Sequence, residues 1–432
     1  MISIRNRLYL LVLKLFGGAY RPVITDDGFI PFTVTPWTKV NIGVTTKYCD
    51  YDYITFTAKA LNYLSSKFSP VNDNSQRKTY DQWATLQQMA VGNLLAEEAQ
   101  QDVSLEDFLL NKTGSFFLKR VHVTKDVDLP SESSQIPEYQ WVVDFSYMES
   151  YPVKEGYYCY GGKVIFDDDR SKIISIEYKG VKYTEIPDWL QMVVRSTVAI
   201  VCVVEVHFCR LHINTAQKNV LKWRNEVSDA DPLVPLLQVV SFNTLVVNRG
   251  LVGLLGIFQA TYALTKNSFD TFITDSLAKG GLDNNSIYGF PGTAWNDKMV
   301  EYATAVTTLV SSLYTADMLS SHDNLIDYIV ACTAGHNQFG DALGSDLFIT
   351  GLFPPAVKIV GDVKTMSYIE FINLRYLLVF VSARPPLFAD DKWYQHFPLS
   401  QQKEHCSTFQ QWMASRNTGW FRPAYFEISI GV

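Results

Sequence analysis

Charged residues are scarce in this sequence, and their distribution excludes one class of partner. They make up 19% of the 432 residues, the formal net charge is −7, and no run of basic residues occurs. A protein that binds nucleic acid gathers lysine and arginine on one surface, where they neutralise phosphates. We therefore expect no nucleic-acid partner for this protein.

The sequence also lacks the motifs of several common enzyme classes. It contains no G-x-S-x-G, no P-loop and no G-x-G-x-x-G after a predicted strand. The glycines between residues 335 and 344 follow a helical pattern, whereas a phosphate-binding glycine loop precedes its helix. Neither nucleophilic serine chemistry nor nucleotide binding is indicated.

The six cysteines show no C-x2-C spacing, so the sequence gives no sign of a cysteine-rich zinc site. Three of them, Cys202, Cys209 and Cys332, lie in apolar segments of helical pattern. These three are predicted to be buried free thiols. Free thiols persist in a reducing compartment, so we expect a cytoplasmic protein.

The N-terminal stretch MISIRNRLYLLVLKLFGG is basic and then apolar, as in a signal peptide. Its apolar run is broken by Lys14, ends without a clear small-x-small cleavage site and is too short to span a bilayer. We expect residues 1–20 to form an amphipathic helix that either docks on the protein or contacts a membrane surface peripherally.

The remaining residues 21–432 are predicted to form one mainly α domain. Hydrophobic residues make up 47% of the chain, enough for a large core. Short β-branched and aromatic segments between residues 115 and 185, divided by GG, DDD and KG turns, indicate an antiparallel β meander. Residues 187–432 are predicted to form a helical core with helices at 189–224, 233–264, 294–316, 322–340, 366–383 and 399–415.

The segment at 189–224 is predicted to be a long central helix. It contains no Pro or Gly and is apolar on all sides up to Val206, so no face of it favours water. His207 and His212 lie near its middle, and a buried imidazole needs a hydrogen-bond partner or a metal. Five residues of α-helix would point the two rings apart, so a shared ligand requires a local π-type widening. Two satisfied core histidines remain the alternative.

A third histidine, His336, follows the apolar helical segment LIDYIVACTAG and has small neighbours, which let another backbone or a ligand come close. The four other histidines are predicted to be structural or solvated. The chain ends in the apolar EISIGV. If that end enters the core, the carboxylate of Val432 has to be paired or bound to a metal.

Five segments, taken in chain order, share a pattern with a known family. They are DQWATLQQMAVGN (Asp81–Asn93), YQWVVDFSYM through SIEYKG, HFCRLH through the segment ending in NRGL, YGFPGTAWNDKM, and the terminal S-I-x-I/V pattern. In this order they resemble the catalytic domain of lipoxygenases, the non-haem iron dioxygenases of polyunsaturated fatty acids. Asp231 stands where the family has a histidine, and the family's N-terminal β-sandwich has no counterpart here.

The resemblance implies a non-haem iron site. The family holds its iron with two histidines of the central helix, a histidine of a second helix and the C-terminal carboxylate. The matching residues are His207, His212, His336 and Val432. A second alignment places His207 on the family's second histidine and Cys202 on its first, which would leave the site altered. Four residues after His336 stands Gly340, where the family often has an asparagine ligand, so that position is expected to hold water.

The resemblance also implies an activity. The chain is expected to abstract hydrogen from a polyunsaturated fatty acid or a similar apolar molecule and to insert O2, with Gly250 and Ile257 lining the substrate pocket. Gly250 stands where the family has a bulky leucine, so a larger or shifted substrate is allowed. The alternatives are another iron-dependent oxidation on the same scaffold, or a metal-free protein that binds an apolar ligand.

Overall fold

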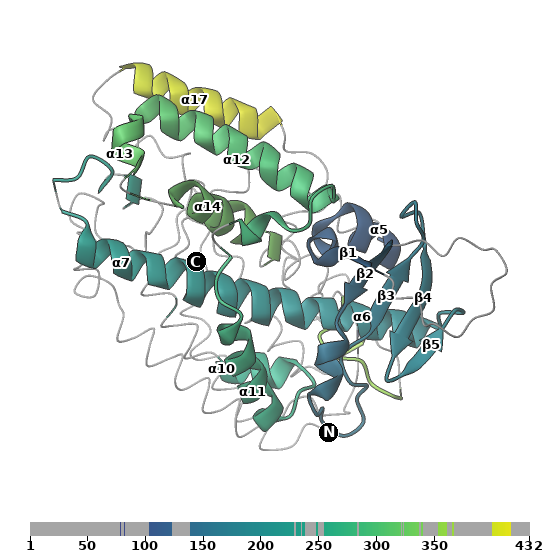
Figure 1. The fold of residues 1–432 in the computed structure, drawn as a ribbon. Helices are drawn as coiled ribbons and strands as arrows, with labels where there is room; N and C mark the ends of the chain where they lie inside the picture. Colours follow the sequence, from purple (N-terminus) through teal and green to yellow (C-terminus); the bar gives the residue numbers. More distant parts are fainter. Residues whose placement is uncertain are drawn as a thin grey trace.

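The computed structural model of the chain is mainly helical, with one small sheet at one end of a long central helix (Figure 1). It describes residues 103–122, 139–228, 230–234, 236–237, 255–282, 285–320, 324–336, 338–339, 353–360, 365–366 and 400–415, together with the single residues 78, 82, 248 and 322. Over these residues the structure confirms the predicted fold class, a mainly α domain with a small antiparallel meander.

The central helix is continuous but changes its winding. It consists of α6 (Asp188–Ile200), the π-helix η7 (Val201–Gln217) and α7 (Lys218–Glu226). It starts directly after Pro187, which suits a helix start because proline has no backbone N–H to satisfy. The predicted helix at 189–224 is confirmed.

Burial explains why this helix tolerates so apolar a sequence. Residues Asp188–Trp223 are long and apolar enough to cross a membrane, but 94% of the most apolar window lies buried inside the protein. The predicted thiols Cys202, Cys209 and Cys332 are buried, and none of the three forms a disulfide bond. This burial is the behaviour of a core helix that the rest of the fold covers.

The sheet packs against the first section of this helix. Its strands lie in the order β1-β2-β3-β4-β5, each antiparallel to the next. Gly162, at φ 108°, brings β3 close to α6, since a Cβ there would lie 3.1 Å from Cγ2 of Val194. The strands are β1 Leu118–His122, β2 Tyr139–Asp144, β3 Lys163–Phe166, β4 Ile173–Tyr178 and β5 Val181–Tyr183.

Helices cover two sides of the central helix (Figure 1). On one side α11 packs on η7, and on the other η9 packs on η7 while α12 packs on both α14 and α17. The helices are α5 Leu105–Asn111, η5 Thr113–Phe117, η6 Ser146–Ser150, α10 Leu255–Thr261, α11 Lys266–Ala278, η8 Ser286–Tyr288, α12 Ala294–Leu313, α13 Ala316–Ser320, α14 Leu325–Val330, η9 Ala331–Gly335 and α17 Ser400–Ser415.

Three further helix predictions are confirmed, whereas the short helix α5 and the longer α11 were not predicted. The helices predicted at 294–316, 322–340 and 399–415 correspond to α12, to α14 with η9, and to α17. Helix α11 was not predicted, because aromatic and β-branched residues weaken its helical pattern; burial of Phe269 and Phe272 compensates. The predictions for residues 1–20 and 366–383, and most of 233–254, lie outside the described residues.

Candidate metal centre

The change to π winding decides where the two central histidines point. In an α-helix, five residues at about 100° each leave two side chains about 140° apart. With i→i+5 hydrogen bonding, five residues make little more than one turn. His207 and His212 both lie within η7, and their rings face each other with centroids 4.7 Å apart. The predicted widening is therefore present, and it extends over the whole of Val201–Gln217.

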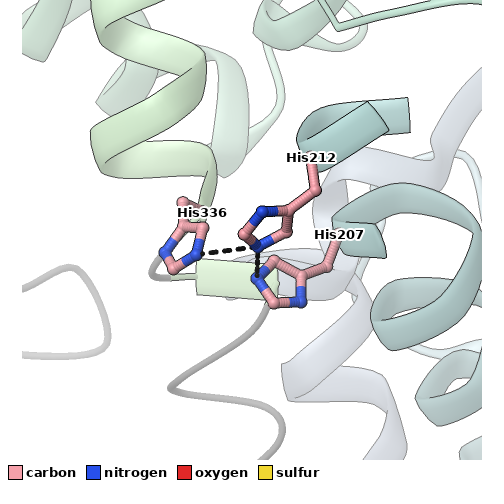
Figure 2. Close-up of side chains that lie close together, drawn as sticks. All are labelled: His207, His212 and His336. Atoms are coloured by element: carbon pink, nitrogen blue, oxygen red, sulfur yellow. Dashed lines mark hydrogen bonds between the residues drawn. The ribbon is translucent and has the colours of Figure 1, made fainter. Parts of the chain in front are cut away.

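The third histidine comes from the second helix. His336 follows directly on η9, and its ring centroid lies 4.6 Å from that of His207 and 4.9 Å from that of His212. Nε2 of His212 lies 3.2 Å from Nε2 of His207 and 3.1 Å from Nε2 of His336 (Figure 2). The three side chains converge from two elements on one point.

These distances match those between the ligand atoms of one metal ion. Imidazole nitrogen lies about 2.0–2.1 Å from a bound metal such as zinc. Two such ligands at a right angle are then about 3.0 Å apart, and at the tetrahedral angle about 3.4 Å. Each of the three histidines offers one ring nitrogen within 4.8 Å of the others, and all three are buried. The residues present therefore fit a metal.

Burial keeps the central imidazoles neutral. Desolvation holds the pKa of His207 well below its ordinary value, and the neighbouring His336 and His212 lower it further. Desolvation also lowers the pKa of His212 to about 4, although the hydrogen bond with Asn248 works against that shift. Neutral imidazole is the form that binds a metal, so both rings are ready ligands at pH 7.

Small residues allow the second helix to approach. The small residues Ala331, Cys332, Ala334 and Gly335 are all buried. A Cβ on Gly335 would lie 2.7 Å from Cδ1 of Ile287 and 3.5 Å from Cδ1 of Leu211, a residue of η7. A larger residue there would displace the end of the Ile287 side chain, so glycine allows the close approach that the small-residue pattern around His336 predicted.

The far side of η7 is tied to the end of α11. The guanidinium of Arg210 donates to the carbonyls of Gly280 and Gly281, and Nδ2 of Asn214 donates to the Leu277 carbonyl at 2.7 Å. Carbonyls at a helix C-terminus lack partners within their own helix. Side chains of the π-helix supply those partners, so the two helices hold each other in place.

A buried carboxylate, Glu205, lies two residues before His207. It accepts hydrogen bonds from the Tyr147 hydroxyl and the Lys279 ammonium, each at 2.7 Å. The ammonium of Lys279 also lies 3.9 Å from the centroid of the Tyr147 ring. This group joins η6 and the end of α11 to η7, and it leaves the carboxylate engaged away from the three histidines.

Sequence reasoning overlooked two polar residues that bear on this site, Glu205 and Asn248. Both are buried; Glu205 is hydrogen-bonded to Tyr147 and Lys279, and Asn248 to His212. Each had a signal in the sequence, since each is an isolated polar residue at the edge of or inside an apolar run, VAIVCVVEV and TLVVN. A polar residue in such a run needs a partner when buried.

The alternative alignment, with Cys202 as a ligand, finds no support in the geometry. Cys202 is buried, and desolvation raises the pKa of its thiol well above the ordinary value, with Glu205 adding to the shift. The group of side chains close enough to share a metal is His207, His212 and His336, within the part of the chain that the structure describes.

Several other predicted site residues are not described. Val432, Gly250 and Gly340 lie outside the described residues, as does the side chain of Ile257. Among their neighbours, Gln338 is buried and its Oε1 accepts a hydrogen bond from Thr113 Oγ1 at 3.2 Å.

A surface groove lies apart from the histidines. It has a volume of about 680 Å³ and runs along α12 and η8. Its walls include Tyr288, Asn296, Thr304 and Asp327. None of the three histidines lines it. The groove therefore is not the predicted substrate pocket.

The fold around the three histidines is similar to that of solved lipoxygenases. A structure of the complete manganese lipoxygenase of Gaeumannomyces graminis, reported with a partial zonadhesin of Komagataella pastoris, aligns at 14% identity over 88% of this chain and 90% of that chain, with a TM-score of 0.58. Coral 8R-lipoxygenase aligns at 13% identity over 99% of this chain and 80% of that chain, with a TM-score of 0.52.

A third similar structure is a lipoxygenase variant in an anaerobic complex with arachidonate, at 13% identity over 100% of this chain and 82% of that chain, with a TM-score of 0.54. No protein-family model and no curated protein matches the sequence. The chain has a lipoxygenase-like fold, and at identities this low the likeness extends to the fold alone.

Proposed function

We propose that this protein is a lipoxygenase-like, metal-dependent dioxygenase of an apolar substrate. The observation that carries the proposal is the contact among three buried Nε2 atoms. A neutral imidazole nitrogen without a proton has one lone pair, which accepts one hydrogen bond in the ring plane. Nε2 of His212 faces two other ring nitrogens, of His207 and His336, at 3.2 and 3.1 Å. A cation at the centre satisfies all three lone pairs together.

The metal we propose is iron, with manganese as the second candidate. Iron follows from the resemblance of the sequence, and two of the similar structures are of manganese lipoxygenases. His207, His212 and His336 would hold it, and the carboxylate of Val432 is proposed as a further ligand from the resemblance. Imidazole and carboxylate ligands with open positions suit a redox-active divalent ion that meets oxygen.

The proposed reaction converts a C–H bond and O2 into a hydroperoxide, so all atoms of both substrates remain in the product. The bound metal would supply the one-electron chemistry for hydrogen abstraction from a doubly allylic carbon. The chain's own contribution is to hold the three ligands on packed helices and to exclude water around them. A polyunsaturated fatty acid is the proposed substrate because it fits the resemblance and because one similar lipoxygenase was crystallised with arachidonate.

Gly250 and Ile257 remain our proposed substrate contacts. Cytoplasmic localisation and peripheral membrane contact also remain proposals, based on the sequence. The alternatives are a different metal-dependent oxidation or a metal-free protein that binds an apolar ligand. Measuring the metal content separates the metal-free binding protein from the dioxygenase.

The test is elemental analysis after anaerobic loading with Fe(II) or Mn(II), followed by oxygen uptake with arachidonate. We expect about one metal ion per wild-type chain. His336→Ala should lose it, while His405→Ala should keep it, because His405 is exposed on α17. A wild-type protein that takes up neither metal would refute the dioxygenase proposal. Metal uptake without oxygen uptake on any polyunsaturated fatty acid would leave a metal protein of different chemistry.

A further inference from the structure

Asn248 makes two hydrogen bonds to one histidine. Its Oδ1 lies 2.8 Å from Nδ1 of His212, and its Nδ2 donates to the backbone carbonyl of His212 at 2.6 Å. Only one orientation of the amide makes both contacts, because the carbonyl of His212 accepts but cannot donate. Oδ1 therefore faces the ring, and Nδ1 of His212 carries the proton that it accepts.

This contact selects the tautomer of His212. A neutral imidazole has one proton, so a proton on Nδ1 leaves the lone pair on Nε2. Nε2 is the atom that faces both His207 and His336. The other tautomer would place an N–H bond at the point where the three rings converge, and that N–H would occupy the position of a metal ion.

Burial makes the selection strong. Asn248 and His212 are both 0% exposed, so water does not compete for either end of the amide. A buried polar group without a partner costs free energy, which penalises the tautomer that leaves Oδ1 facing a bare nitrogen. The position of Asn248 thus favours the metal-binding form of His212 before any metal arrives.

We propose that Asn248 is a positioning residue of the metal centre: it holds His212 as the Nδ1–H tautomer and so presents the Nε2 lone pair to the metal. This inference rests on the proposed function. Partners that fix the tautomer of a metal-binding histidine raise metal affinity, and their loss lowers it about 10–100-fold.

Two variants separate this role from a structural one. Asn248→Ala removes both hydrogen bonds. Asn248→Asp keeps an acceptor for Nδ1–H but removes the donor to the backbone carbonyl of His212. The matched control is Asn214→Ala, which removes another buried asparagine hydrogen bond from η7, on the side of α11.

The first measurement is anaerobic titration with Mn(II) and Fe(II). We expect Asn248→Ala to lower the affinity about 10–100-fold. Asn248→Asp should stay near the wild-type affinity although it unfolds more readily, and Asn214→Ala should lose stability without losing metal. Equal losses in the alanine and aspartate variants would show that Asn248 acts only by tying its segment to η7, and would overturn the inference.

The second measurement does not need the metal. In metal-free protein with ¹⁵N-labelled histidine, the two-bond ¹H–¹⁵N correlations report the tautomer, and the signal of His212 is identified by its absence in His212→Gln. We expect Nδ1–H in wild type and Asn248→Asp, and a mixture in Asn248→Ala. An unchanged tautomer in Asn248→Ala overturns the inference. Failure of the wild type to bind metal instead refutes the proposed function, so the two failures are distinguishable.

Discussion

Two sections of the central helix, α6 and η7, are buried to a similar degree but differ in the side chains that they bury. In α6 the buried side chains are mostly apolar and pack against the sheet, as Val194 does beside Gly162. In η7 the helix buries two imidazoles, a carboxylate and an asparagine side chain. The buried Arg195 and Thr197 of α6 donate to backbone carbonyls. In η7, Glu205 and His212 instead meet side chains of distant segments, which are Tyr147, Lys279, His336 and Asn248.

This comparison teaches that burial alone does not decide whether a helix position accepts a polar residue. A buried polar group costs free energy unless it is paired. The π winding of η7 turns side chains that an α-helix would spread around its circumference toward common partners. The four tests that follow break or sharpen this contrast, in order of expected effect.

A polar residue introduced into α6 should be the most damaging change. Val198 is 0% exposed, and Val198→Asn removes apolar burial and leaves an amide without a partner. We expect a loss of about 4 kcal/mol in the free energy of unfolding, against about 2 kcal/mol for Val198→Ala. Urea denaturation of both variants measures the difference. If asparagine costs no more than alanine, α6 accepts an amide without a partner at this position and the contrast between the two sections fails.

Metal should stabilise through η7 and not through α6. At a free Mn(II) concentration 100 times the dissociation constant, we expect a gain of about 2.7 kcal/mol in the wild type. His212→Gln should show no gain. Val198→Ala should be less stable than the wild type without metal but should gain the same free energy of unfolding from Mn(II), because α6 supplies no ligand. Thermal unfolding with Mn(II) or EDTA measures both, and a gain retained by His212→Gln would exclude that residue from the site.

The buried carboxylate of η7 should depend on its partner. The side chain of Glu205 is 6% exposed and that of Lys279 is 38% exposed, so solvent screens the pair in part. We expect Glu205→Gln to cost about 2 kcal/mol and the double variant with Lys279→Met to cost less than the sum of the two single changes, by about 1 kcal/mol. Additive costs would show that the two groups do not interact.

The smallest effect is expected where η7 meets the loop after α11. Thr215 Oγ1 accepts from the backbone N–H of Leu282 at 2.7 Å and donates to the Arg210 carbonyl at 3.0 Å. Thr215→Val should cost about 1 kcal/mol, because it leaves that N–H without its acceptor. Thr308→Val, at an exposed position of α12, is the control and should be nearly neutral. Equal losses of stability in both variants would show that the hydrogen bond between Thr215 and Leu282 does not stabilise the fold.

Much of this fold follows from patterns in the sequence. The length, the apolar character and the absence of proline and glycine predicted the central helix, and the alternation of short β-branched segments with turns predicted the sheet. Helix α11 escaped because its local propensity is weak, and only tertiary burial of Phe269 and Phe272 makes it a helix. Local patterns describe local preferences, and this helix is stabilised by contacts with η7.

The convergence of His207 and His212 was predicted only as one of two possibilities. The spacing required a widened helix, which no local pattern reports, since π winding depends on the contacts that the whole fold makes. His336 lies 124 residues from His212 in the chain, and Asn248 lies 36 residues from it. Chain-distant partners of this kind come from tertiary structure, so the sequence offered isolated buried polar residues as clues but not their pairings.

The separation of the ligands along the chain gives the proposed metal a second effect. His207 and His212 are five residues apart, but His212 and His336 are 124 residues apart. An ion held by all three would cross-link the ends of a long loop, much as a disulfide does. A cross-link lowers the conformational entropy of the unfolded chain. For a loop of about 100 residues this stabilises the folded state by about 4.7 kcal/mol, provided that the ion stays bound to the unfolded chain. The same three side chains would then stabilise the fold as a cross-link, in addition to forming the reaction centre.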